Sequence, residues 1–281
     1  MSTPTVTLPS GDAIPVVGQG TYELEGDAVR EPVAAALDAG YAHVDTAEGY
    51  VNERALGDAL AATDVHRDEV FLTSKVLPKH LAYESVLEAC ERTLDALGTD
   101  YLDLYLIHWP NPAISMRETL DALAALHDRG LVRNVGVSNF STYQLGVACH
   151  VSDVPIAVNQ IEYHPWLQRP ELVEFCREHD VAVEAAAPLA RGEFLDDDAL
   201  AEIADKHGKT PAQVVLRWAV EGDVVVLPKS GSPAHVRENL DVFDFELDPE
   251  DRERIDAMDR DHAVYDDRQR DWTRDTFGIA K

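Results

Sequence analysis

The chain has 281 residues, of which 52 are acidic and 24 basic, giving a formal net charge of −28. A surface this acidic repels nucleic acids and anionic membranes, so we expect neither as a partner. No apolar run approaches the ~18 residues that span a bilayer, and the first residues lack the basic and apolar segments of a secretory signal. The three cysteines are too widely spaced for a disulfide framework or a metal box. We therefore expect a cytoplasmic protein without a metal.

The carboxylates are scattered along the chain rather than gathered in a tail. Self-repulsion of this size destabilises a compact fold at low ionic strength. At molar salt the Debye length falls to about 3 Å and most of that penalty is screened. The charge pattern therefore predicts a salt-adapted, halophilic protein.

Short apolar runs alternate with amphipathic stretches from residue 16 onward, as in a parallel sheet of strand–helix units. The runs expected to be strands are 16–17, 43–45, 70–73, 102–107, 132–137, 157–159, 181–183 and 224–227. The helical patterns are 28–39, 53–62, 83–97, 116–129, 142–149, 170–179, 198–207 and 233–240. Eight such units predict an α/β protein with a (β/α)8 TIM barrel.

Two further segments flank these units. Residues 6–14 are expected to form a β-hairpin before the barrel, and residues 249–258 one extra helix after it, followed by a tail. No stretch has the composition of a linker, so residues 1–281 are interpreted as one domain. The run Gly18-Gln19-Gly20 resembles part of a dinucleotide-binding fingerprint, but Glu23 replaces its third glycine, and we interpret the run as a tight turn into the barrel.

Four residues with chemical potential stand at or just beyond the carboxyl ends of three successive predicted strands. They are Asp45, Tyr50, Lys75 and His108. In a barrel these strand ends converge, so residues far apart in sequence are expected to meet. Each residue type alone is common as a solvated charge, a helix cap or a core residue. Together on successive strands they predict a catalytic group.

The chemistry of this group is that of a carbonyl reductase. Asp45 and Lys75 are expected to pair, and the Lys75 charge beside the phenol is expected to lower the pKa of Tyr50. Proton transfer from that phenol to a carbonyl oxygen is general acid catalysis, and His108 would orient the oxygen. No side chain supplies a hydride, so the pattern requires a nicotinamide cofactor.

Five motifs carry a resemblance to a known family. They are residues 40–53, 100–110, 133–140, 158–165 and 227–230, which read GYAHVDTAEGYVNE, DYLDLYLIHWP, RNVGVSNF, VNQIEYHP and LPKS. In this order they resemble the aldo-keto reductase family over essentially the whole chain, and within it the short-loop prokaryotic branch of diketogluconate and glyoxal reductases. The resemblance implies NADPH-dependent reduction of aldehydes and ketones, with the same four catalytic residues.

The resemblance also implies where the ligands bind. The cofactor residues are Gly20, Thr21, Ser138, Asn139, Gln160, Pro188, Leu189, Lys229, Ser230, His235, Glu238 and Asn239. Among them Ser138, Asn139 and Gln160 would hold the nicotinamide carboxamide, and Leu189 would lie against the pyrophosphate. Glu238 and Asn239 would reach the adenine, and Lys229 and Ser230 the adenosine 2′-phosphate. The substrate, a small-molecule carbonyl compound, would contact Tyr22, His108 and Trp109.

Three positions depart from the family pattern. Ala186 stands where the family usually has a Tyr or Trp that stacks on the nicotinamide, and Ala187 stands where it has a Ser. Another aromatic residue is needed to replace the missing ring, and Tyr22, Trp109, Trp272 and Phe277 remain open as candidates. His235 stands where an Arg often holds the 2′-phosphate, and histidine is mostly neutral at pH 7. We therefore expect NADP(H) to be preferred, with NAD(H) also accepted.

Two other functions stay open at the level of sequence. The chain could be a cofactor-binding regulatory or structural barrel with little turnover, or a sugar or polyol dehydrogenase that works in the oxidative direction. The complete set of four catalytic residues argues against a mere binder. We expect a monomer or a weak homo-oligomer.

Overall fold

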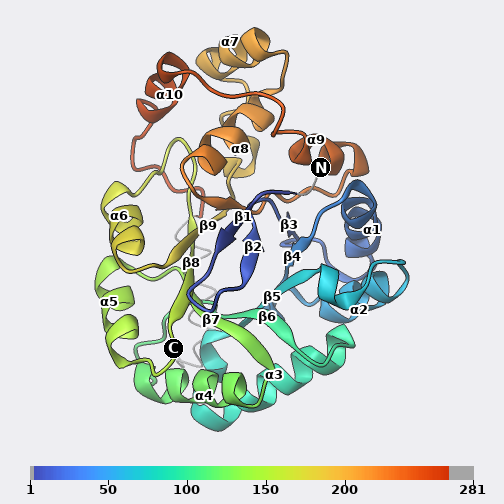
Figure 1. Cartoon of the computed structure of the whole chain (residues 1–281), viewed down its shortest axis with the longest axis vertical. Coiled ribbons are helices and arrows are strands. Elements are labelled where there is room, and N and C mark those ends of the chain that lie inside the picture. The colour runs from blue at the N-terminus through green and yellow to red at the C-terminus, as the bar shows by residue number, and fades with distance from the viewer. Residues whose placement is uncertain (1–2, 266–281) are drawn as a thin grey trace, which may run out of the picture.

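The computed structural model describes residues 3–265 (Figure 1). Its main sheet has eight parallel strands in sequential order from β3 to β10. They are β3 (Gln19–Gly20), β4 (His43–Asp45), β5 (Phe71–Val76), β6 (Leu102–Ile107), β7 (Val132–Ser138), β8 (Ile156–Glu162), β9 (Ala182–Ala186) and β10 (Val225–Val226). Parallel bridges from Val17 to Val226 and from Gly20 to Lys229 join the two ends of the sheet. The predicted (β/α)8 fold is confirmed.

Helices surround the sheet (Figure 1). They are α1 (Arg30–Ala39), α2 (Glu53–Ala61), α3 (Tyr83–Leu97), α4 (Met116–Asp128), α5 (Thr142–Val151), α6 (Pro170–Glu178), α7 (Asp198–His207), α8 (Pro211–Glu221), α9 (Pro233–Leu240) and α10 (Pro249–Asp256). The chain turns away from α1 and α3 through Gly40 and Gly98, whose φ angles of 98° and 66° favour glycine. No helix in residues 3–265 has the length and apolarity needed to cross a membrane.

The sequence prediction differs from the structure in two places: one strand boundary was wrong and one helix was missed. The first strand is not residues 16–17: Val16 lies in a bend, Val17 forms a single bridge, and β3 begins at Gln19. Helix α8 was not predicted at all, although it begins with a capping box in which the Thr210 side chain accepts from Gln213 N and a proline occupies its first turn. More than half of its residues are buried, and the unit between β9 and β10 contains two helices, α7 and α8.

The predicted hairpin is confirmed and closes one end of the barrel. Strands β1 (Thr5–Thr7) and β2 (Ala13–Pro15) pair antiparallel. Leu8 and Ile14 pack with Leu104, Leu106 and Val158 in a cluster inside the barrel. The turn of the hairpin is held by hydrogen bonds of Ser10 and Asp12 to Asn134, near the start of β7. Burial of these apolar side chains seals the amino-terminal end, so the carboxyl ends of the strands are left to form the site.

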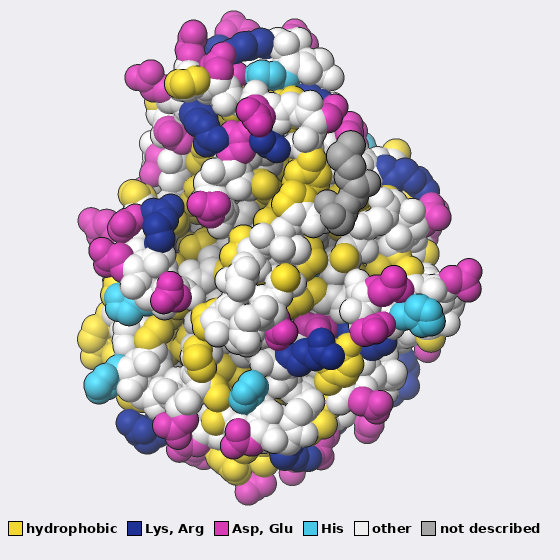
Figure 2. Space-filling model, in the orientation of Figure 1, with side chains coloured by type: hydrophobic (Ala, Val, Ile, Leu, Met, Phe, Trp, Pro, Cys, Tyr) yellow, Lys and Arg dark blue, Asp and Glu magenta, His cyan; other side chains and the backbone are white. Residues whose placement is uncertain are grey.

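The surface carries the charge imbalance of the sequence. Figure 2 shows, on the face in view, many carboxylates interspersed with fewer basic side chains. Some surface carboxylates form ion pairs, such as Asp58 with Arg30 at 2.7 Å. The acidic residues therefore belong to the folded surface of the barrel.

Candidate active site

The structure brings three of the four predicted catalytic residues into direct contact. Asp45 ends β4, Lys75 lies in β5, and Tyr50 ends a short 3-10 helix (Glu48–Tyr50). The fully buried Lys75 Nζ lies 2.7 Å from Asp45 Oδ1 and donates a 3.2 Å hydrogen bond to Tyr50 Oη. A third bond, to Thr46 O at 2.8 Å, completes the donors of the ammonium group. The phenol oxygen is therefore held at the end of a buried ion pair.

Asn52 fixes the loop that carries Tyr50, a role that sequence reasoning missed. This buried side chain donates to the carbonyl oxygens of Thr21 and Leu24, each at 3.0 Å, and accepts from Thr46 Oγ1 at 2.7 Å. The bonds to Thr21 and Leu24 join the loop after β3 to the loop after β4, and the bond from Thr46 braces the second loop internally. The sequence feature that could have pointed to Asn52 is its position inside the 40–53 motif.

The expectation that Lys75 lowers the pKa of Tyr50 was wrong for this state of the protein. Burial raises that pKa well above 10, and the negative charge of Asp45 raises it further. The physical reason is that a buried phenolate loses its hydration, while Asp45 neutralises the Lys75 charge at a distance of 2.7 Å. Tyr50 therefore keeps its proton throughout the physiological pH range.

Glu184, in β9, is a second buried carboxyl group behind the ion pair. Gln160 Nε2 joins the two acids, with a 3.0 Å bond to Asp45 Oδ2 and a 2.5 Å bond to Glu184 Oε2. Burial, together with the Asp45 charge, raises the pKa of Glu184 to about 8. At neutral pH Glu184 is mostly protonated, so Asp45 alone balances Lys75.

His108 follows β6, and its ring centroid lies 5.6 Å from that of Tyr50. Burial and the nearby Lys75 charge lower its pKa well below 6.5, so the imidazole is neutral. Asn139 donates a 3.0 Å hydrogen bond to His108 O and a 2.9 Å bond to Ser138 Oγ, which ties the end of β6 to the end of β7. A neutral imidazole can orient a carbonyl oxygen, and Tyr50 is left as the group with a proton to give.

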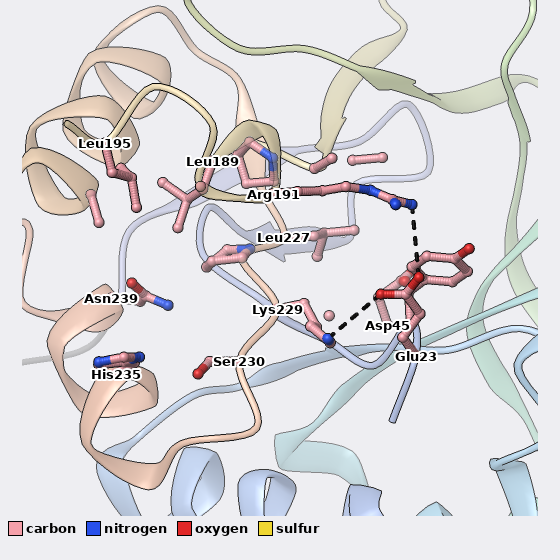
Figure 3. Close-up of a pocket in the computed structure, with 18 of the residues that line it drawn as sticks. Glu23, Asp45, Leu189, Arg191, Leu195, Leu227, Lys229, Ser230, His235 and Asn239 are labelled. Atoms are coloured by element: carbon pink, nitrogen blue, oxygen red, sulfur yellow. Dashed lines mark ion pairs between the residues drawn. The ribbon is translucent and has the colours of Figure 1, made fainter. Parts of the chain in front are cut away.

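Two clefts meet at Tyr50. The first, of about 500 Å³, contains most of the predicted cofactor residues, namely Gly20, Gln160, Pro188, Leu189, Lys229, Ser230, His235, Glu238 and Asn239 (Figure 3). The second, of about 540 Å³, contains the predicted substrate residues Tyr22, His108 and Trp109 together with Ser138 and Asn139. Thr21 lines neither cleft, because it is fully buried and its hydroxyl donates to Asp45 O at 2.8 Å.

The first cleft has the shape and donor groups for a phosphorylated dinucleotide. A Cβ on Gly20 would lie 3.0 Å from Leu227 O, so glycine leaves this wall open. Ser230, His235 and Asn239 lie away from the junction, and Lys229 lies between them and Glu23 (Figure 3). Together these groups suit a phosphate and a base. Lys229 Nζ and Arg191 Nη2 each lie 3.9 Å from a Glu23 carboxylate oxygen, and Figure 3 shows both cations directed toward it.

Ala186 lies where the two clefts meet. Tyr265, an aromatic residue that sequence reasoning did not single out, lines the same junction. The residues common to both clefts are Tyr22, Glu23, Tyr50, Gln160, Ala186 and Tyr265. Of the aromatics considered as substitutes for a ring at position 186, Tyr22 lies at the junction and Trp109 in the second cleft only. Trp272 and Phe277 lie outside the described residues.

Comparison with known proteins decides the family. Residues 17–260 match the model of the aldo/keto reductase family. The chain belongs to the aldo-keto reductase family. A glyoxal reductase of Bacillus subtilis is 42% identical over 261 residues, which cover 92% of this chain and 94% of that protein. Membership assigns the chain to the oxidoreductases.

Solved structures of the aldo-keto reductase family agree with this fold. An aldo/keto reductase from Brucella melitensis superposes with a TM-score of 0.87 at 42% identity, covering 92% of this chain and all of that one, 100%. An aldo-keto reductase from Bombyx mori, solved in complex with NADP, has a TM-score of 0.89 at 33% identity and covers 95% and 96% of the two chains.

Proposed function

We propose that this aldo-keto reductase reduces small aldehydes and ketones to alcohols with NADPH, and that Tyr50 is the general acid. The observation that carries the proposal is the buried chain of contacts from Asp45 through Lys75 to Tyr50, with distances of 2.7 and 3.2 Å. A protein that only binds a cofactor has no need for a protonated phenol next to a buried ammonium group.

With its nicotinamide ring at the junction of the two clefts, a bound reduced cofactor would supply the hydride for the carbonyl carbon. The residues of the chain manage the proton and the geometry. Tyr50 Oη donates its proton to the carbonyl oxygen as negative charge develops there. Lys75 donates to the same phenol oxygen and stabilises the phenolate at the moment it forms, although the pKa of the resting phenol is raised. The neutral His108 orients the carbonyl oxygen toward Tyr50.

The second cleft supports a small substrate. Tyr22 and Trp109 make it aromatic at its mouth, and Tyr22 packs edge-on against Tyr50 with ring centroids 5.2 Å apart. Apolar walls with a few polar groups at one end are typical of sites for small molecules. Because a relative at 42% identity is named a glyoxal reductase, small aldehydes and dicarbonyls such as glyoxal are the first compounds to test.

Cofactor choice is proposed to rest on Lys229 and Ser230, which line the first cleft. A fixed ammonium near the adenosine 2′-phosphate favours NADPH. An imidazole at position 235 lacks the permanent charge of an arginine side chain. The Lys229 ammonium also faces a Glu23 carboxylate oxygen at 3.9 Å. NADPH is therefore preferred, and NADH is also accepted.

The test follows NADPH absorbance at molar salt with a panel of small carbonyl compounds. Tyr50→Phe keeps the ring and removes the proton, so turnover should fall by about 10²- to 10⁴-fold while NADPH still binds. Tyr143→Phe, at a ring that is 81% exposed, serves as the matched control. Wild-type protein that binds NADPH but turns over none of the panel would instead indicate a regulatory barrel. Full activity in Tyr50→Phe would refute the assigned proton donor.

A further inference from the structure

The junction of the two clefts needs a flat apolar surface if a nicotinamide ring is to lie there. On the β9 side this position belongs to Ala186, whose side chain is a single methyl group. Ala186 and Tyr265 both line the two clefts, and Tyr265 comes from the segment that follows α10. Burial raises the pKa of the partly buried Tyr265 well above 10, and the nearby Tyr50 and Glu162 raise it further.

A carboxylate anchors the backbone of Tyr265 beside Ala186. Glu162 Oε1 accepts from Val264 N at 2.5 Å, and its Oε2 accepts from Tyr265 N at 3.3 Å. Glu162 is the register partner of Ala186 across the β8–β9 pair. Two backbone hydrogen bonds therefore hold Val264 and Tyr265 at Glu162, the strand position next to Ala186. Hydrogen bonds to a charged acceptor are stronger than neutral ones.

Several contacts hold this anchor in place. Buried His164 pairs with Glu162 at 2.9 Å, and these hydrogen bonds bring the pKa of Glu162 below its usual value despite its burial. Upstream in the same segment, His262 N bonds to Trp166 O at 3.0 Å, and the Arg260 guanidinium lies 3.4 Å from the Trp166 ring centroid. The segment 260–265 is thus fixed to the loop after β8 at more than one point.

One cation, the Arg191 guanidinium, also lies near the Tyr265 ring. The Arg191 guanidinium lies 5.9 Å from the Tyr265 ring centroid and 5.8 Å from that of Tyr22. Arg191 therefore lies between two aromatic rings at the cleft junction. A ring held by its backbone and by a cation loses little freedom when a ligand stacks on it.

We propose that Tyr265 supplies the stacking surface for the nicotinamide ring that Ala186 cannot provide, and that Glu162 positions it. The inference rests on the proposed use of NADPH. Stacking of an aromatic side chain on a heterocyclic base strengthens binding of that ring, and it leaves the rest of the dinucleotide unaffected. Tyr265 is accordingly a binding residue for one end of the cofactor only.

The experiment measures equilibrium binding of two ligands by fluorescence titration. The ligands are NADPH and 2′-phosphoadenosine diphosphoribose, which is the same molecule without the nicotinamide ring. Tyr265→Ala should weaken NADPH binding by about tenfold and leave the binding of the fragment unchanged. Tyr265→Phe should bind both ligands as the wild type does, because the ring is kept. Tyr143→Ala, at an exposed tyrosine of α5, is the matched control.

A double variant gives the stricter test. Ala186→Trp in the Tyr265→Ala background returns a ring from the strand and should recover NADPH affinity. The inference would be overturned if Tyr265→Ala lowered the affinity for both ligands equally, or lowered the affinity for neither. It would also be overturned if the only change were in KM for the carbonyl substrate. These results differ from failure of the proposed function, in which the wild type itself neither binds NADPH nor reduces any carbonyl compound.

Discussion

Glu184 makes the stability of this barrel depend on pH in a direction opposite to that of most carboxylates. The side chain is fully buried, accepts a hydrogen bond from Gln160 and lies 3.6 Å from the His43 ring nitrogen. Burial lowers the pKa of His43 to about 3, so that ring stays neutral and offers no positive charge. Asp45 already neutralises Lys75. The variant Glu184→Gln replaces the protonated acid by a neutral group of the same shape.

The size of the effect follows from the pKa of Glu184. Burial and the Asp45 charge raise it from 4.5 to about 8 in the folded protein. The folded state thus holds a proton that the unfolded chain has lost, and this stability is present at low pH and disappears as the pH rises through 8. Between pH 6 and pH 8 the wild type should lose about 2 kcal/mol of unfolding free energy relative to Glu184→Gln.

The assay is denaturant unfolding followed by circular dichroism across this pH range at constant salt. Subtracting the unfolding free energy of Glu184→Gln from that of the wild type cancels the contributions of the other titrating groups, which the two proteins share. Glu88→Gln, at a side chain that is 72% exposed, should give a curve parallel to the wild type. Parallel curves for wild type and Glu184→Gln would show that Glu184 is already ionised at pH 6, and the charge assignment behind the catalytic residues would be wrong.

Three further predictions concern the ion pair, the cofactor and the salt dependence. Lys75→Met leaves the buried Asp45 unpaired and should lower the unfolding free energy by about 3–5 kcal/mol, and adding Asp45→Asn should recover part of this loss in the same denaturation assay. Lys229→Ala should reduce the ratio of kcat/KM for NADPH over NADH by about tenfold, and an unchanged ratio would remove Lys229 from cofactor selection. The thermal midpoint should rise between low and molar potassium chloride because salt screens the net charge of −28, whereas full stability without salt would contradict salt adaptation.

The sequence determined the architecture because strand and helix periodicity is local. Apolar runs separated by amphipathic stretches predicted seven of the eight strands at nearly their observed positions, and helices such as Tyr83–Leu97 and Asp198–His207 have the predicted bounds. Parallel strands in a barrel bring their carboxyl ends together, so Asp45, Lys75 and His108 could be grouped without coordinates. Helix α8 was missed although its capping signal, Thr210 with Gln213, is present in the sequence.

Only the tertiary structure decided how these residues behave. The pKa of Tyr50 is raised rather than lowered first because the phenol is buried, and then because the Asp45 charge lies nearby. Tyr265 likewise lines the clefts together with Ala186, and its backbone is held there by a hydrogen bond to Glu162 that spans 103 positions of sequence. Desolvation and long-range contacts depend on which distant segments pack together, and no local pattern of residues encodes them.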